Sequence, residues 1–282
     1  MVSALQAIPI GALLLGLATP AVSEADSAPS DQWEFYAGAT ALRFGYKELN
    51  EGARIPRILD REDGTLPGLR TGLRARTKAW TFSANANFVR GTADYRGVSS
   101  VGSPVRTTTD ESIIDLSATA GYDLPLSSPL APALYAGLGY RVWRRDIRSS
   151  GPVGGLGEVY RSSYALLGAR ATLWKSKMMQ VLADLRVSEA LDPTLGVDFR
   201  GAFDNARLKL PARPGWHAAL PWTLSLLSGG SLQVEPYYEY WRSPRSVSAQ
   251  ITRQGFALAR ELHEPKSQMG NFGISLTWVR TL

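Results

Sequence analysis

Charged side chains recur inside segments that otherwise alternate between apolar and polar residues, and they are the groups best suited to electrostatic chemistry. They are Arg70, Arg74, Asp115, Arg141, Arg170, Asp184, Arg186, Glu235 and Glu239. A period of two places each of them on the polar side of a strand. Buried charges must be paired, so we expect neighbouring strands to bring Asp115 near Arg141 and Arg170 near Asp184, as a salt-bridged plug. The alternative is a polar conduit or ligand site.

Histidine and cysteine limit the catalytic chemistry that this chain can support. There are two histidines, His217 and His263, and no cysteine. Cysteine nucleophiles, disulfides and multi-histidine metal sites are therefore excluded. We expect His217 to face inward near the outer end of its strand, where it could approach Ser188 or Asp184. Spacing positions no nucleophile or orienting partner beside it, so we predict no catalytic residue and no cofactor, with His217 and Asp184 as the alternative.

An acidic segment at 59–64 could suggest a metal site, but its spacing does not fit one. Counting back from Gly64 places Leu59 and Arg61 where a calcium-binding loop needs acidic residues. We interpret the segment as a charged turn and predict no metal site. The alternative is a divalent ion that bridges loops or lipopolysaccharide.

Positive charge is spread along the chain rather than gathered in blocks. The formal net charge is +6, and arginine supplies most of the cations. No glycine-rich phosphate loop opens a helix, so we expect no nucleic-acid partner. Arginine pairs well with phosphates, and a basic rim could bind lipopolysaccharide, although solvated loops would look the same. The candidate contacts are Arg144, Arg145, Arg148, Arg242 and Arg245.

The elements that position these groups are alternating segments joined by connections of alternating length. The segments are 32–46, 67–76, 80–95, 112–124, 133–147, 161–174, 178–191, 215–224, 232–242 and 270–282. Long and short connections, such as 47–66 and 77–79, follow each other in turn. This pattern predicts an all-β, antiparallel transmembrane β-barrel of about ten strands, with eight or twelve as alternatives. Long loops would be extracellular and short turns periplasmic; a soluble β-sandwich is the competing fold.

Aromatic residues gather near the ends of the predicted strands. Trp33, Trp80, Trp174, Trp222 and Trp278 fall near the periplasmic ends. Tyr46, Tyr95, Trp143, Tyr160 and Trp241 fall near the outer ends. We expect two aromatic girdles at the membrane interfaces. Pro221 and Pro236 lie inside predicted strands, where proline lacks a ladder donor.

The N-terminal segment has the apolar core and small residues of a secretory signal peptide. We expect a signal peptide at 1–25, a short lead at 26–31 and a barrel at 32–282. The final strand would pair with 32–46 and close the barrel.

Over about 32–282 the chain resembles Gram-negative outer-membrane β-barrels of the small, ten-stranded class that includes the omptin proteases. Local phrases at 59–64 and 237–241 are similar to those of uncharacterised proteobacterial surface barrels. The resemblance implies location in the cell outer membrane, contact with its lipid and insertion by the barrel-assembly machinery. Leu282 and Arg280 depart from the usual C-terminal assembly signal.

An omptin-like protease would need an Asp-His pair at the rim, and the sequence has no Asp-His dipeptide. We therefore expect a structural, adhesive or narrow-channel, porin-like role with a charged, plugged lumen. The alternative is a surface hydrolase, acting on protein or lipid, with an outer-rim site near His217. The sequence does not indicate an oligomeric state.

Overall fold

The computed structural model describes residues 31–50, 57–99, 102–126, 128, 130–226 and 229–282. The expected signal peptide and all but the last residue of the lead lie outside this part. No helix in the described part is long and apolar enough to cross a membrane.

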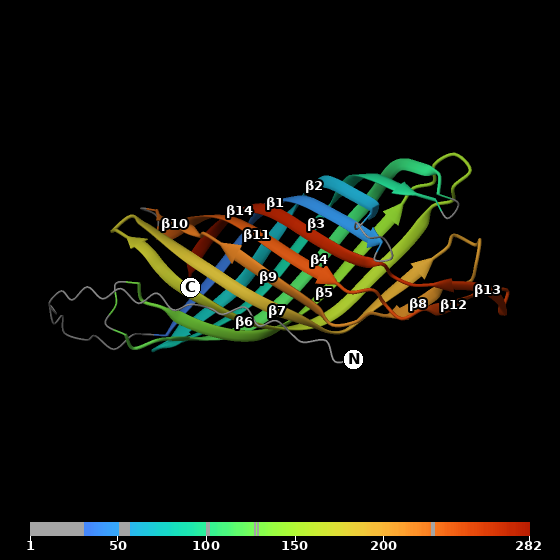
Figure 1. The fold of residues 1–282 in the computed structure, drawn as a ribbon. Helices are drawn as coiled ribbons and strands as arrows, with labels where there is room; N and C mark the ends of the chain where they lie inside the picture. Colours follow the sequence, from blue (N-terminus) through green and yellow to red (C-terminus); the bar gives the residue numbers. More distant parts are fainter. Residues whose placement is uncertain (1–30, 51–56, 100–101, 127, 129, 227–228) are drawn as a thin grey trace.

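The described residues form strands joined by turns and loops. The strands are β1 (Gln32–Asn50), β2 (Arg57–Thr77), β3 (Trp80–Val98), β4 (Pro104–Asp123), β5 (Ala133–Ile147), β6 (Leu156–Lys175), β7 (Met179–Asp198), β8 (Ala206–Lys209), β9 (Arg213–Ala219), β10 (Trp222–Ser225), β11 (Gly230–Ser243), β12 (Ala249–Arg253), β13 (Phe256–Leu262) and β14 (Lys266–Thr281). Within this part of the chain, β1 to β7, the broken strand β9/β10, β11 and β14 close into a ten-stranded antiparallel barrel (Figure 1).

The last strand closes the ring as expected. On β14, Trp278 lies opposite Ala37 of β1 on one side and Leu232 of β11 on the other. No edge of the barrel wall is then left to meet lipid, where an unpaired backbone group would cost several kcal/mol. The predicted fold class and the pairing of the final strand with the first are confirmed.

Several strands are longer than their alternation suggested. The expected loops at 47–66 and 97–110 are largely paired, with Glu48 opposite Asp60 and Arg96 opposite Arg106. Charged and turn-forming residues hide the period of two in these stretches, but backbone pairing does not depend on apolar side chains. The barrel wall therefore continues as hairpins beyond the predicted membrane-spanning segments. Segment 59–64 is part of β2 and is not the turn that we expected.

Pro221 interrupts the eighth strand of the wall, whereas Pro236 does not break β11. β9 ends at Ala219, β10 begins at Trp222, and the Leu182 N–H donates to the Pro221 carbonyl at 2.9 Å. Pro236 stays within the ladder opposite Ile274. A proline is tolerated in a strand only where no ladder donor is required. Outside the wall, β12 and β13 form a separate hairpin at the long-loop end.

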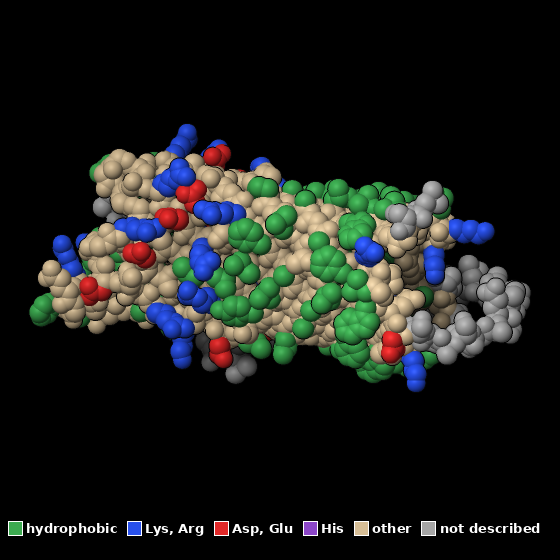
Figure 2. All heavy atoms as spheres, turned by 180° about the vertical axis from the view of Figure 1, so that it is seen from behind, with side chains coloured by type: hydrophobic (Ala, Val, Ile, Leu, Met, Phe, Trp, Pro, Cys, Tyr) green, Lys and Arg blue, Asp and Glu red, His purple; other side chains and the backbone are tan. Residues whose placement is uncertain are grey.

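A belt of exposed apolar side chains surrounds the middle of the barrel. Figure 2 shows it on one face, with charged side chains toward both ends. The predicted periplasmic tryptophans belong to this surface and are 42–53% exposed. At the other end, exposed cations follow the apolar residues on the same outer face of their strands. These cations are Arg43, Arg90, Arg144, Arg161 and Arg242.

The predicted outer girdle is wrong for four of its five residues. Tyr46, Trp143, Tyr160 and Trp241 are buried inside the barrel. Each shares the parity of the inward residues of its strand, so it cannot face lipid. Together with Phe44 and other apolar residues they form an interior cluster in the outer half of the barrel.

Candidate functional site

Ion pairs between strands line the half of the lumen that is nearer the short turns. Arg141 donates two hydrogen bonds to Glu239, at 2.9 and 2.7 Å. Arg170 and Asp184, which lie opposite each other on β6 and β7, are 3.0 Å apart. Two further pairs join Arg74 to Glu34 and Arg70 to Glu235. Most of the carboxylates predicted to face the lumen therefore meet an arginine, as buried charges require.

Two predicted lumen residues, Asp115 and Arg186, lack a close ion pair. The Asp115 carboxylate lies 3.9 Å from Arg141, which is directed mainly toward Glu239, and it accepts a 2.7 Å hydrogen bond from Tyr164. Arg186 makes no ion pair with any residue that the structure describes. It lies on β7 opposite His217 and faces the lumen.

These side chains surround a cavity of about 690 Å³. Arg76, Lys175 and Leu126 line it near the short turns, and Arg141 and Glu239 line it deeper in the barrel. Leu42, Val89 and Ile113, all buried apolar residues, stand at its far end. The space is polar along its walls and ends against an apolar layer.

His217 faces this cavity but lacks the partners that acid–base catalysis needs. Its ring stacks on Tyr237 with centroids 5.3 Å apart, and its Nδ1 has no hydrogen-bond partner in the described part of the chain. Asp184 accepts hydrogen bonds from Arg170 and Tyr135 instead. The alternative catalytic pair, His217 with Asp184, is not brought together by any hydrogen bond or ion pair among the described residues. His263 lies in the segment between β13 and β14 and is distant in sequence from His217 and Asp184.

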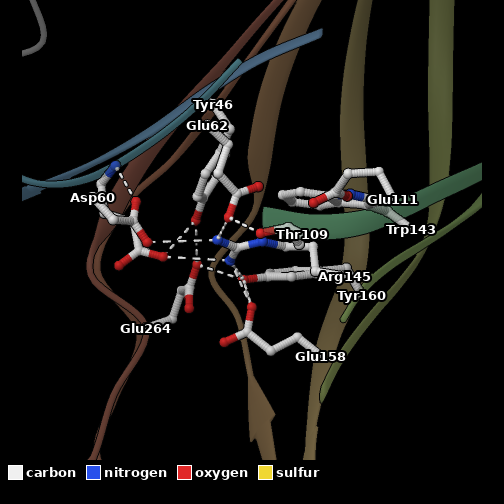
Figure 3. Close-up of polar contacts among 11 residues, drawn as sticks. Tyr46, Asp60, Glu62, Thr109, Glu111, Trp143, Arg145, Glu158, Tyr160 and Glu264 are labelled. Atoms are coloured by element: carbon white, nitrogen blue, oxygen red, sulfur yellow. Dashed lines mark hydrogen bonds and ion pairs between the residues drawn. The ribbon is translucent and has the colours of Figure 1, made fainter. Parts of the chain in front are cut away.

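The outer half of the lumen contains a second polar group, centred on Arg145 of β5. The Arg145 side chain is 0% exposed. Its guanidinium lies 2.6 Å from Glu62 and 2.6 Å from Glu158, and 3.5 Å from both Glu48 and Asp60. Figure 3 shows it beside the rings of Tyr46, Trp143 and Tyr160, and Arg145 stacks over Tyr46 at 4.4 Å.

Two further carboxyl groups complete this arrangement, which we call the Arg145 cluster. Glu111 accepts a 2.6 Å hydrogen bond from the Trp143 indole. Glu264, from the segment between β13 and β14, accepts hydrogen bonds from Tyr46 and Tyr160 at 3.0 and 2.9 Å. One arginine thus stands among six carboxyl groups, which are those of Glu48, Asp60, Glu62, Glu111, Glu158 and Glu264.

The charge of the cluster is unbalanced, and Glu264 shows the consequence. Burial raises the pKa of the Glu264 carboxyl well above its ordinary value, and the neighbouring carboxylates of Glu48 and Glu158 raise it further. Arg145 and the Tyr160 hydroxyl act in the opposite direction without cancelling the effect. A buried carboxyl group that has too few cations around it binds a proton.

Sequence reasoning did not identify the Arg145 cluster, although a signal was available. Glu62 and Asp60 share the parity of the lumen residues Arg70 and Arg74 on β2. Arg145 likewise shares the parity of Arg141 on β5. Extending the period of two beyond the expected strand ends would have placed these residues inside. Glu264 had no such signal because it lies outside any strand.

Four of the five arginines of the predicted basic rim lie on the surface, and the fifth, Arg145, is buried. Arg144, Arg242 and Arg245 are exposed, and Arg148 pairs with Asp110 at 2.9 Å on the surface. Arg145 points inward, because it has the opposite parity to Arg144, and its complete burial removes it from the lipopolysaccharide set. The described residues contain no group of three or more side chains that could hold a metal ion.

Comparison with known proteins supports the fold. No protein-family model matches the chain, and no curated protein matches it. The outer membrane protease OmpT from Escherichia coli aligns with a TM-score of 0.63 and 11% identity, over 92% of this chain and 99% of OmpT. The chain therefore has the fold of an outer-membrane β-barrel. The apolar belt on its outer face agrees with this fold, because such a belt is the surface that barrels present to lipid.

Two other outer-membrane proteins align less closely with this barrel. The translocator domain of NalP from Neisseria meningitidis gives a TM-score of 0.45 and 12% identity, over 90% of each chain. OprG from Pseudomonas aeruginosa gives 0.40 and 10%, over 90% of this chain and 97% of OprG. Neither alignment carries an activity to this chain.

Proposed function

We propose that this outer-membrane barrel has a structural or adhesive role at the cell surface and that its outer half is plugged by its own side chains. The observation that carries the proposal is the Arg145 cluster, whose central guanidinium has no exposed surface. Its partners come from β1, β2, β4 and β6, so the cluster spans the lumen from wall to wall. Water and ions would have to displace it to pass.

The layer beneath the cluster supports the same proposal. Leu42, Phe44, Leu66, Val89 and Ile113 are buried inside the barrel. They belong to a continuous apolar cluster with Trp143. Packed side chains at the density of a protein interior leave few voids larger than a water molecule. A narrow-channel role would require this layer to move.

The long-loop end offers an exposed surface for adhesion. Asp204 accepts hydrogen bonds from the Thr252 hydroxyl at 2.7 Å and from the backbone N–H groups of Gln254 and Gly255 at 3.0 and 2.9 Å. These bonds hold the turn of the β12–β13 hairpin, which carries Phe256 with 76% of its surface exposed. A fixed turn with an exposed aromatic ring suits contact with another surface.

The exposed cations support a further part of the proposal, contact with lipopolysaccharide. Arg144 and Arg242 lie on the outer face of the wall where the apolar belt ends. Arg245 is exposed beyond β11. Guanidinium groups at that level suit bidentate pairing with lipid phosphates. Insertion would use the barrel-assembly machinery, as for other barrels of this class.

Planar-bilayer conductance of the purified barrel tests the plug. We expect membranes with inserted protein to show no unitary current steps, because the Arg145 cluster and the apolar layer fill the outer lumen. Flotation with liposomes and a heat-modifiable shift in gel mobility establish insertion and folding in the same preparation. Steady current steps from folded protein would contradict the plug and favour the narrow-channel role.

A further inference from the structure

The segment that carries Glu264 is attached to the cluster differently from the other carboxylates. Glu48, Glu62, Glu111 and Glu158 lie on β1, β2, β4 and β6, whose backbones are paired on both sides in the barrel wall. Glu264 lies in 263–265, between β13 and β14 and outside any strand. We call residues 244–265, which include the β12–β13 hairpin, the arm.

The β12–β13 hairpin of the arm forms a sheet separate from the barrel wall. The Glu264 backbone N–H donates to Ser246 Oγ at 2.8 Å, and the Ser246 N–H donates to the Glu264 carbonyl at 3.0 Å, so these two residues move together. Ala249 and Leu262 pack on the interior apolar cluster. Asp204 holds the far turn. Among the described residues, the carboxyl group of Glu264 makes the arm's hydrogen bonds to the Arg145 cluster.

The hydrogen-bond pattern around Glu264 accommodates a proton on its carboxyl group. The Tyr46 hydroxyl lies 3.0 Å from oxygens of both Glu48 and Glu264. The Tyr160 hydroxyl lies 3.2 Å from Glu158 and 2.9 Å from Glu264. Each hydroxyl has one hydrogen, so it can donate to one carboxylate only. A hydrogen on the shared carboxyl group, that of Glu264, allows it to donate to one of the hydroxyls.

Among the described residues, anions outnumber cations around this position. Arg145 is the cation that contacts the carboxylates, and Arg213 of β9 stacks over Tyr160 at 5.8 Å. The titratable and charged groups that interact with Glu264 or with the other members of its cluster are Tyr46 and Glu48 of β1, Asp60 and Glu62 of β2, Tyr95 of β3, Glu111 of β4, Arg145 of β5, Glu158 and Tyr160 of β6, Arg213 of β9 and His263 of the arm. Lys266 follows Glu264 in the chain.

We propose that Glu264 makes the arm a pH-sensitive latch over the outer mouth of the barrel. While the carboxyl group is protonated it fits between the two tyrosine hydroxyls, and the arm stays closed. When the proton is lost, a buried carboxylate faces several others with one arginine already shared among them. The wall strands cannot separate, so the arm is the element that moves, and it exposes the cluster to the medium.

The direction of the pH effect follows from linkage. A carboxyl group with a pKa that is raised in the closed state binds more protons there than in the open state. It stabilises the closed state fully below the ordinary carboxyl pKa of about 4.3. That stabilisation is lost as the pH rises through the raised value. Acid therefore closes the latch and alkali opens it.

A single cysteine can report on the opening, because the chain has none of its own. Ser267 is buried at the start of β14, two residues after the arm ends, and lies opposite Glu48 of the cluster. In the folded protein Ser267→Cys, we expect the maleimide labelling rate, relative to the exposed Ser248→Cys, to rise roughly tenfold or more between about pH 5 and about pH 9. Heat-modifiable mobility verifies that each variant is folded.

The matched control is the same cysteine with Glu264→Gln, which keeps the size and the acceptor oxygen but cannot ionise. A nearby carboxylate raises the pKa of a thiol and slows its labelling, so a steeper rise in the protein with Glu264 reports opening and not thiol ionisation. We expect a much flatter profile for the glutamine variant. Identical profiles in the two proteins would overturn the latch.

Amide hydrogen exchange in the unmodified protein provides a test that needs no variant. After correction for the intrinsic pH dependence of exchange, peptides covering 244–265 should lose protection with rising pH, while peptides from β4 and β5 keep it. Unchanged protection of the arm across this range would also overturn the proposal. Both tests measure movement of the arm and do not depend on whether the barrel conducts.

Discussion

At the residue scale, Arg145 has the most demanding environment in the described part of the chain. Four carboxylates lie within 3.5 Å of its guanidinium, which is wholly removed from solvent. Removing one partner of a buried ion pair is costly because the remaining charges stay in a poorly solvating interior. The residue therefore stabilises the cluster mainly by preventing repulsion among its neighbours.

We predict that Arg145→Met destabilises the barrel by about 3–5 kcal/mol, because it leaves buried carboxylates without a cation. Chemical unfolding in detergent, followed by tryptophan fluorescence, measures the change. The control is Arg148→Met, three residues later, which removes an exposed pair with Asp110 and should cost about 0–1 kcal/mol. Equal effects of the two substitutions would show that burial of Arg145 does not set its contribution.

At the element scale, tyrosines lie over glycines of neighbouring strands and join the wall to the lumen network. The Tyr135 ring covers Gly168, and the Tyr135 hydroxyl donates a 2.6 Å hydrogen bond to Asp184. Tyr164 covers Gly139 in the same way and donates to Asp115 at 2.7 Å. A side chain at either glycine would overlap the ring, so these positions require close approach rather than an unusual backbone.

Gly168→Ala tests this arrangement. Its added methyl group would overlap the Tyr135 ring and displace the hydroxyl from Asp184, so we expect a loss of about 1–3 kcal/mol in unfolding free energy. Gly196→Ala, on β7, is the control, because a Cβ there meets nothing closer than the Val159 carbonyl at 3.9 Å. The control should be neutral or slightly more stable. A Gly168→Ala barrel as stable as the native one would contradict the role of the contact.

At the scale of the whole molecule, one surface has two chemical zones. Along β14 the outward residues Phe272, Ile274, Leu276 and Trp278 are exposed and apolar. Gln268, on the same outward face, lies beyond the belt toward the long loops. The closed ring satisfies the backbone, and this zoning fixes the depth at which the barrel lies in the bilayer.

We predict that Ile274→Arg lowers the stability of the inserted barrel by about 2–4 kcal/mol, since it places a charge near the centre of the belt. Gln268→Arg introduces the same side chain outside the belt and should cost about 0–1 kcal/mol. Unfolding of both variants from liposomes provides the comparison. A similar cost at the two positions would mean that the belt does not lie in the hydrocarbon core.

The sequence alone determined the architecture, because strand parity and connection length are local properties. The alternation around Ile274 and Leu276, and the short connections such as 77–79, were sufficient to predict a barrel of about ten strands closed by its last strand. The same parity identified the inward arginines and carboxylates. The girdle prediction was wrong at Tyr46 and Trp143, because it rested on their position near a strand end, whereas their parity places them inside.

The tertiary structure alone decided which inward groups meet, because pairing across a barrel depends on register, shear and curvature. Arg141 is directed mainly to Glu239, which is distant in sequence and reaches it across the lumen, although Asp115 lies opposite it on the adjacent strand. Glu264 reaches the Arg145 cluster from outside any strand, so no periodicity could place it. The wall was predictable from local patterns, whereas the contents of the lumen depend on contacts between strands far apart in the chain.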